Sequence, residues 1–272
     1  MITPGEIQKI ASRQSLRDTQ IEKDYVIGWI LGGVSKNEIL KSALAFKGGT
    51  AIRKFYIKDY RFSEDLDFTY VKGKMDKEIL KQEFESVLSR VNVESRIRLE
   101  LRNDKMHNTG NYNFYIGYAG PLGGKIENKD IKVDICDSEK MCGATQKLAA
   151  YNEYSDLTDK YELDCYSIND IISEKMRSLM QRTMPRDLYD LWFFFEKDNK
   201  DILDYVYDFQ EKAGFKEIAP NKFADTVIQK KEKYKSNWEN NLTSQIKITP
   251  EFETVWRELL RHFKQMDKYL NK

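Results

Sequence analysis

The sequence predicts an α+β fold, in which a mixed β-sheet with flanking helices is followed by a helical C-terminal half. Two observations support this prediction: apolar and polar residues alternate in the centre of the chain, and apolar residues recur at helical spacing on either side of it. The chain has 272 residues, of which 40% are hydrophobic, so it can bury a substantial core. A disordered tail is excluded, and we expect two domains, over residues 1–160 and 161–272.

The N-terminal segment predicts two helices. Thr3 and Pro4 mark the start of the first, because proline is tolerated at the first helical position. A second helix is expected from about residue 17 to 31, where apolar residues have helical spacing. Gly32 and Gly33 are expected to end this helix.

The centre of the chain predicts half-buried strands at 65–69, 96–102, 112–118 and 130–135, with a helix over 77–90 and a turn at 121–124. Arg96, Arg98 and Arg102 form one polar face of the second of these strands. Such a face either follows an RNA backbone or protects an edge strand by its charge.

Helical spacing returns at residue 168. The first C-terminal helix is interrupted at Pro185, and further helices are expected near 202–213, 220–235 and 250–270.

Charge and composition narrow the class of protein. Lys and Arg number 45 against 44 Asp and Glu, so the whole chain has no net field that would attract nucleic acid. No apolar run approaches the roughly 18 residues that cross a bilayer, so we expect a cytoplasmic protein with no membrane partner. Cys136, Cys142 and Cys165 lack CxxC spacing, which favours buried thiols over a zinc site or disulfides.

The chemistry is predicted to lie between Lys47 and Asp67. Gly48, Gly49 and Thr50 form a turn in which glycine lets the backbone approach phosphate oxygens, although an ordinary strand-to-helix turn has the same composition. Asp65 and Asp67 would project from one strand face and repel each other unless a cation lies between them. Mg²⁺ prefers such carboxylate oxygens, and paired ions activate a hydroxyl and stabilise the departing oxygen of a phosphate.

A third acid strengthens this interpretation. Asp134 lies on the polar face of a separate apolar strand, where it would add a carboxylate beside the first two. Ser63 would share the strand face of Asp65 if the strand extends that far back.

Several segments together resemble the AbiEii/AbiGii-type nucleotidyltransferase toxins, a branch of the DNA polymerase beta-like nucleotidyltransferase superfamily. The resemblance covers roughly residues 20 to 195. The matching segments are IEKDY (21–25), KGGTA (47–51), RFSEDLDF (61–68), EKMR (174–177) and QRTMPRDLYDL (181–191).

The resemblance implies a polymerase beta-like sheet that binds Mg²⁺ and a nucleoside triphosphate (NTP). It assigns the metal to Asp65, Asp67 and Asp134. Lys175 would act on the triphosphate, and either Asp187 or Asp190 would be the late acid. Lys175 and Arg182 are seven residues apart, so on one helix they would lie about 10 Å apart along a polyanion. The full set of implied nucleotide-binding residues is Lys47, Gly48, Gly49, Thr50, Ser63 and Arg182.

The implied activity is transfer of a nucleoside monophosphate to RNA, especially the 3′ end of tRNA, by the toxin of a toxin–antitoxin or phage-defence system. A cognate antitoxin is then an expected partner. Two alternatives stay open: the acceptor is a protein hydroxyl or a small molecule such as an aminoglycoside, or the domain binds a partner without catalysis. The intact acids argue against the last alternative.

Overall fold

The computed structural model describes residues 1–108 and 110–271, which fold into two compact units. Unit 1 comprises Met1–Ser138 and Thr145–Tyr166, and unit 2 comprises Glu139–Ala144 and Ser167–Lys272. No helix within the described ranges is long and apolar enough to span a membrane.

Unit 1 is built on a seven-stranded mixed sheet, which confirms the predicted fold class. The strand order is β3-β4-β5-β2-β1-β7-β6, with parallel pairing between β1 and β7 and between β2 and β5. The strands are β1 (Leu44–Lys47), β2 (Leu66–Tyr70), β3 (Arg98–Met106), β4 (Tyr112–Ala119), β5 (Asp130–Cys136), β6 (Gln146–Ala149) and β7 (Glu162–Cys165).

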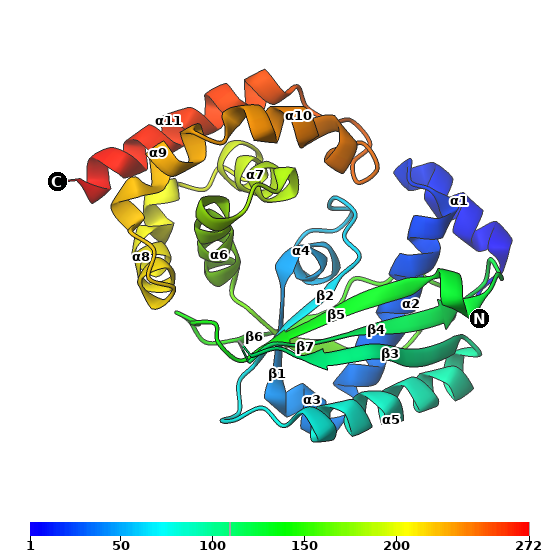
Figure 1. Cartoon of the computed structure of the whole chain (residues 1–272). Coiled ribbons are helices and arrows are strands. Elements are labelled where there is room, and N and C mark those ends of the chain that lie inside the picture. Colours follow the sequence, from blue (N-terminus) through cyan, green and yellow to red (C-terminus); the bar gives the residue numbers. More distant parts are fainter. Residues whose placement is uncertain (109, 272) are drawn as a thin grey trace. The chain divides into compact units, whose positions relative to one another are not determined.

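The helices of unit 1 flank this sheet, and Figure 1 shows α4 and α5 on opposite sides of it. A short π-helix, Ile52–Tyr56, continues directly from α4, and Ile126–Asn128 is a 3₁₀ turn. The helices are α1 (Pro4–Gln14), α2 (Asp18–Ser35), α3 (Glu38–Ala43), α4 (Gly48–Ala51) and α5 (Lys77–Ser95).

One face of the sheet carries the core. Phe46, Phe68 and Phe114 come from three different strands and gather around Phe84 of α5, with successive ring centroids 5.0, 6.4 and 4.9 Å apart. On β2, β4 and β5 the residues between these buried positions are mostly half-buried and polar. The predicted alternation therefore separates an apolar face from a polar one.

The prediction that Gly32 and Gly33 end the second helix is wrong, because α2 continues to Ser35. A Cβ added at Gly33 would lie 2.8 Å from side-chain atoms of both Val87 and Val91 on α5. Glycine at this position therefore permits close packing of two helices.

The predicted basic strand face is also partly wrong. Helix α5 extends to Ser95, beyond the expected residue 90, and Arg96 caps it in the left-handed conformation. Only Arg98 and Arg102 lie on β3, which is at the edge of the sheet as the charge pattern suggested.

Unit 2 is helical, as predicted for the C-terminal half, but two predicted helices are interrupted. The first begins as a 3₁₀ turn at Ile202–Tyr205, and the second divides into Phe223–Ile228 and Lys231–Leu242. The helices are α6 (Ile168–Gln181), α7 (Pro185–Trp192), α8 (Val206–Phe215), α9 (Phe223–Ile228), α10 (Lys231–Leu242) and α11 (Phe252–Leu270), with a π-helix at Phe193–Lys197.

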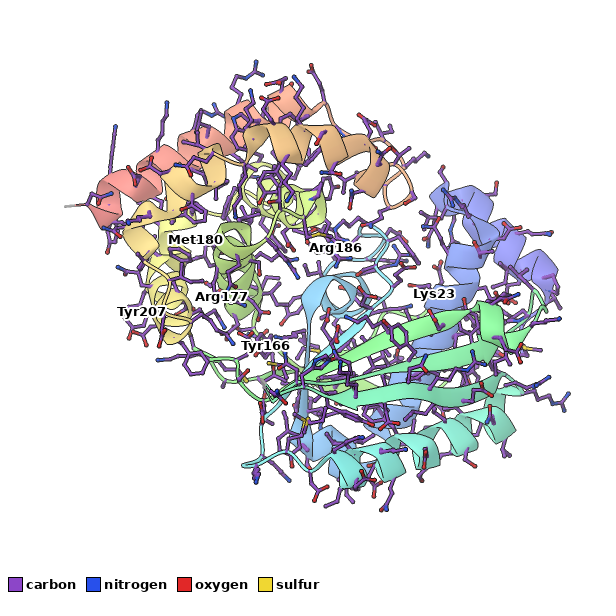
Figure 2. All side chains as sticks on the ribbon, in the orientation of Figure 1. Lys23, Tyr166, Arg177, Met180, Arg186 and Tyr207 are labelled. Carbon is purple, nitrogen blue, oxygen red and sulfur yellow. The ribbon has the colours of Figure 1, made fainter. Side chains whose placement is uncertain are left out.

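The segment Glu139–Ala144 belongs to unit 2 because its backbone is bound there. The amide groups of Cys142 and Gly143 donate hydrogen bonds to Asp170 at 2.8 and 3.0 Å, and Lys212 lies 2.7 Å from the same carboxylate. In Figure 2, Arg177 lies on α6; it pairs with Glu139 at 3.4 Å. All three cysteines are free and buried or half-buried, as expected.

Candidate active site

Three strands of unit 1 align charged side chains in one row across the polar face. Lys47 at the end of β1 pairs in register with Asp67 on β2, and Asp67 pairs in turn with Asp134 on β5. Directly paired residues project from the same face with Cβ atoms about 5 Å apart. Asp134 therefore lies beside Asp67, although 66 residues separate the two in the chain by their numbers.

Asp65 lies just before this row, in the segment that leads into β2. The strand begins at Leu66, so the expectation that Asp65 belongs to it is wrong, and the strand does not extend back to Ser63. Thr50 is fully buried, and its Oγ1 lies 2.6 Å from the carbonyl oxygen of Asp65 and 3.0 Å from Oγ of Ser63. These contacts hold the acid-bearing segment against the glycine turn.

The glycine turn is in direct contact with the acids. Gly48 has φ +80°, and a Cβ added there would lie 2.5 Å from Oδ2 of Asp67. A Cβ at Gly49 would lie 2.8 Å from Oγ of Ser63 and 2.9 Å from Nη2 of Arg61. Because Gly48 and Gly49 have no side chains, the backbone of the turn can lie close to the carboxylate of Asp67 and the guanidinium of Arg61. Sequence reasoning did not assign Arg61 a role.

We expect Gly48→Ala to lower both stability and activity. The positive φ costs about 1–2 kcal/mol for a non-glycine residue, and the added methyl group would displace the Asp67 carboxylate. Gly73→Ala is the matched control, because Gly73 has φ +60° but no neighbouring atom within 4 Å of an added Cβ. Urea unfolding should show a loss in both variants, whereas nucleotide transfer should fall only in Gly48→Ala. Equal activity in the two variants would contradict this role for Gly48.

Lys132 is a further member of the site that sequence reasoning missed. Its Nζ lies 2.6 Å from Oδ2 of Asp134, two residues along β5 and on the same face. Burial lowers the pKa of Lys132, but Asp134, Asp65 and Asp67 raise it by more, so the net pKa is raised. The alternation of β5 was a signal that could have identified this residue.

The carboxylates of Asp65, Asp67 and Asp134 are not arranged around a common cation position in this structure. Within residues 1–108 and 110–271, no three Asp, Glu, His or Cys side chains form a ready-made metal-ligand group. Oδ1 of Asp134, however, is buried without a hydrogen-bond partner among these residues. Buried polar atoms in proteins nearly always have a hydrogen-bond partner, so this carboxylate oxygen is an exception. Carboxylate oxygens are the donors that hard divalent cations prefer, and in this structure the ammonium group of Lys132 pairs with one oxygen of Asp134.

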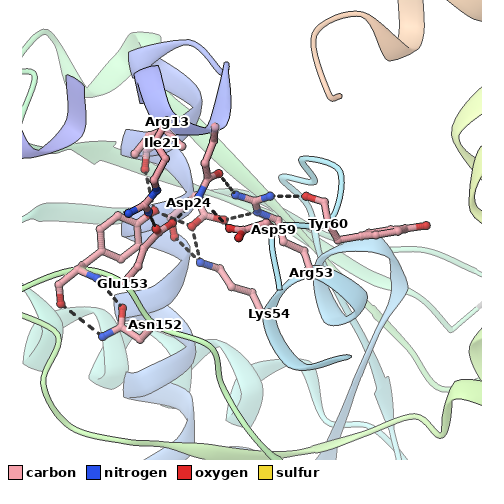
Figure 3. Close-up of polar contacts among 11 residues, drawn as sticks. Arg13, Ile21, Asp24, Arg53, Lys54, Asp59, Tyr60, Asn152 and Glu153 are labelled. Atoms are coloured by element: carbon pink, nitrogen blue, oxygen red, sulfur yellow. Dashed lines mark hydrogen bonds and ion pairs between the residues drawn. The ribbon is translucent and has the colours of Figure 1, made fainter. Parts of the chain in front are cut away.

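A buried charge network involves the two helical residues Arg53 and Lys54, which follow the glycine turn in the chain (Figure 3). Asp24 of α2 accepts from Nε of Arg53 at 3.0 Å and from Nζ of Lys54 at 2.5 Å. These two consecutive residues belong to the π-helix Ile52–Tyr56, which continues from α4. Arg53 also donates to the carbonyl oxygen of Tyr60, just before the acid-bearing segment. The network thus connects α2 to the helical residues after the glycine turn and to Tyr60, which lies before the acid-bearing segment.

Lys47 packs at the end of β1 with only 8% of its surface exposed. Its Nζ lies 5.4 Å from the centroid of the Tyr166 ring. The hydroxyl oxygen of Tyr166 in turn lies 2.6 Å from Oγ1 of Thr69. Lys47 is therefore a positioned cation in the same row as Asp67.

Unit 2 holds the other predicted site residues as one cluster, in which Lys175, Asp187 and Asp190 are buried and Arg182 is exposed. Lys175 pairs with Asp190 at 2.6 Å and with Asp187 at 3.2 Å, so both late acids contact it. The expectation that Lys175 and Arg182 share a helical face is wrong, because α6 ends at Gln181 and Arg182 has extended backbone. Arg182 instead lies 2.8 Å from Asp187. Burial raises the pKa of Asp187, but Lys175 and Arg182 lower it by more.

The chain is similar to known nucleotidyltransferase toxins. The family model described as nucleotidyl transferase AbiEii toxin, type IV toxin–antitoxin system, matches residues 29–269. A comparison with curated protein sequences finds no match.

Among solved structures, the nucleotidyltransferase toxin MenT4 from Mycobacterium tuberculosis H37Rv aligns with a TM-score of 0.68 at 15% identity, covering 98% of this chain and 90% of that one. JHP933 from Helicobacter pylori aligns with a TM-score of 0.54 at 17% identity, covering 94% and 95%. These TM-scores show a shared fold, and the family model extends over most of the sequence. The chain therefore belongs to the AbiEii family of nucleotidyltransferase toxins of type IV toxin–antitoxin systems.

Proposed function

We propose that the protein transfers a nucleoside monophosphate from an NTP to the 3′ hydroxyl of an RNA, with the 3′ end of tRNA as the acceptor, in a Mg²⁺-dependent reaction. The observation that supports this proposal best is the polar row on the sheet. Asp67 and Asp134 are in register with each other, and the Asp67 carboxylate lies against the backbone of Gly48.

In the proposed reaction the hydroxyl oxygen of the acceptor attacks the α-phosphorus. The bond between this phosphorus and the oxygen that bridges to the β-phosphate breaks, pyrophosphate leaves, and the hydroxyl proton passes to solvent. Bound Mg²⁺ would lower the pKa of the hydroxyl and balance the charge that develops on the departing oxygen.

The chain's own residues bind and orient the reactants. Asp65, Asp67 and Asp134 would hold the metal, and Thr50 positions Asp65 through its carbonyl oxygen. The backbone of Gly48 and Gly49 would approach the phosphates, together with Lys47 and Ser63. Preorganised charges of this kind stabilise the transition state without rearranging during the reaction.

For the unit 2 cluster, we propose that Lys175 supplies positive charge for the triphosphate and that Asp187 and Asp190 orient its ammonium group. Arg182 would assist through Asp187. The support is the family match, which spans these residues, together with the ion pairs that buried Lys175 makes with Asp187 and Asp190 and that exposed Arg182 makes with Asp187. The proposed biological role follows from the family: such transfer would inhibit growth until a cognate antitoxin counteracts it.

The proposal is tested by incubating the protein with each labelled NTP, Mg²⁺ and either total RNA, cell protein or aminoglycosides. We expect label to enter RNA, and excess EDTA to stop the reaction because the carboxylates alone cannot activate the hydroxyl. Addition of Mg²⁺ or Mn²⁺ beyond the EDTA concentration should restore transfer. Label in protein or in the small molecule would reject the RNA acceptor, and full activity in EDTA would reject the metal dependence.

A further inference from the structure

The polar face of the sheet continues past the acids toward its edge. Tyr115 on β4 pairs in register with Lys132 on one side and with Arg102 on the other. Asn113 on β4 likewise pairs with Asp134 and with Lys105. We call Arg102, Lys105, Asn113 and Tyr115 the β3–β4 strip. It begins directly beside the metal-binding acids and ends at the edge strand.

A β-bulge places Lys105 in this strip. The register shifts between Arg102 and Lys105, and Asn103 in the bulge has φ +52°. Simple alternation would put Lys105 on the face of Leu101, whereas the inserted residue brings it opposite Asn113 on the polar face. Arg102 and Lys105 therefore present two cations on the same side of β3.

Arg102 has a hydrogen-bond donor that the described part of the chain does not use. Its guanidinium lies over Gly117, where an added Cβ would be 2.5 Å from Cζ. Nε pairs with Glu100, but Nη2 is buried and has no hydrogen-bond partner within the described ranges. The Arg102 side chain as a whole keeps 19% of its surface exposed, and a guanidinium there can pair with a phosphate oxygen of a ligand.

The type of side chain on the polar face changes from strand to strand between the edge strand β3 and the acids. Cations lie on β3, and a half-buried aromatic ring and an amide lie on β4. Lys132 and Asp134 follow on β5, and Asp67 follows on β2. Because neighbouring strands are about 4.8 Å apart, the cations of β3 lie about 10 Å from β5. Aromatic rings beside a basic groove are typical of surfaces that bind single-stranded nucleic acid, since bases stack on the ring and phosphates contact the cations.

We propose that the β3–β4 strip binds the single-stranded 3′ end of the RNA acceptor. A base near the end stacks on Tyr115, the preceding backbone contacts Arg102 and Lys105, and the terminal hydroxyl lies toward Asp67 and Asp134. This inference rests on the proposed function, because it assigns the acceptor subsite of that same reaction.

Binding is measured separately from catalysis, by fluorescence anisotropy of a 5′-labelled single-stranded RNA with the Asp67→Asn protein as parent. We expect Tyr115→Leu to weaken binding about tenfold through loss of stacking, and Tyr115→Phe to match the parent. Arg102→Gln and Lys105→Gln should each weaken binding and reduce the salt dependence of log K by about 0.7.

Arg96→Gln is the matched control, because this exposed arginine caps α5 and lies outside the strip. In the active protein, the strip variants should raise the KM for RNA with little change in the KM for NTP.

The outcomes separate a failure of the β3–β4 strip proposal from a failure of the proposed function. In one outcome, the wild-type protein labels RNA while the strip variants bind RNA as tightly as their parent and have an unchanged KM for RNA. That result would reject the β3–β4 strip as the RNA-binding surface and would leave the proposed function in place. Equal loss in Arg96→Gln would show a non-specific charge effect and also overturn the strip. If the Asp67→Asn parent does not bind RNA and the wild-type protein transfers label to protein instead of RNA, both the strip and the proposed function are overturned. A single-stranded DNA of the same sequence that binds as tightly would remove the specificity for RNA.

Discussion

Asp67→Asn is expected to abolish nucleotide transfer while leaving the fold intact. Asp67 is central among the acids, since it is in register with Asp134 and its carboxylate lies against Gly48. The amide keeps the shape of the side chain but removes a negative charge that would hold the metal. Metal ions stabilise transition-state charge by several kcal/mol, so kcat should fall at least about 1,000-fold.

Stability should respond in a different way. The Asp67 carboxylate repels the neighbouring acids but attracts Lys132, so the loss of its charge has opposing effects, and the free energy of unfolding should change by less than about 1 kcal/mol. Far-UV circular dichroism during urea unfolding measures this, alongside the transfer assay with labelled NTP.

The control for Asp67→Asn is Glu64→Gln. Glu64 is an exposed carboxylate in the same segment, and it pairs with Lys23 at 3.1 Å rather than with the glycine turn. Its loss should leave transfer close to the wild-type rate. Substantial transfer by Asp67→Asn at saturating Mg²⁺, or an equal loss in Glu64→Gln, would show that the polar row is not the catalytic centre.

Much of the site could be predicted because strand alternation is a local property of the sequence. The period of two in residues 130–135 places Asp134 on a polar strand face, and the same period places Lys132 beside it. Which strands become neighbours is not local. The pairing of Asp67 with both Lys47 and Asp134 depends on the order of strands in the sheet, and β1 is too short to show a period of its own.

Other features escaped prediction because one residue type serves several structural purposes. Glycine often ends a helix, yet Gly33 lies inside α2, where its small size admits Val87 and Val91. The bulge at Asn103 changes which face Lys105 occupies, and no pattern in the sequence announces it. In unit 2, Arg182 was placed on the helix of Lys175, but the helix ends one residue earlier and the arginine turns to Asp187.

Asp24→Asn is expected to cause the largest loss of stability. The side chain is 2% exposed, and it accepts from Arg53, Lys54 and the hydroxyl of Tyr154. Removing its charge leaves two buried cations without their anion, which typically costs about 3–5 kcal/mol. This is a large part of the roughly 5–15 kcal/mol that stabilises a folded protein.

The control for Asp24→Asn is Asp59→Asn, at an exposed position near the same network, where a change within about 0.5 kcal/mol is expected. Urea unfolding at pH 7 compares the two variants. Equal stability of Asp24→Asn and wild type would contradict the network's role.

The pH dependence identifies Asp24 as the source of this stability. Burial raises its pKa, but the charges of Lys54 and Arg53 lower it by more, so the pKa in the folded state lies well below the ordinary value of 3.8. A depressed carboxyl pKa contributes stability that is present above the ordinary value and is lost as the pH falls toward the folded one. The difference in unfolding free energy between wild type and Asp24→Asn should therefore stay constant from about pH 6 to 8, and it should shrink below pH 3.8. A difference that changes near neutral pH would assign the effect to another group.

Because Arg53 and Lys54 continue the helix that begins at Gly48, the loss of Asp24 should also loosen the glycine turn and reduce transfer before the protein unfolds.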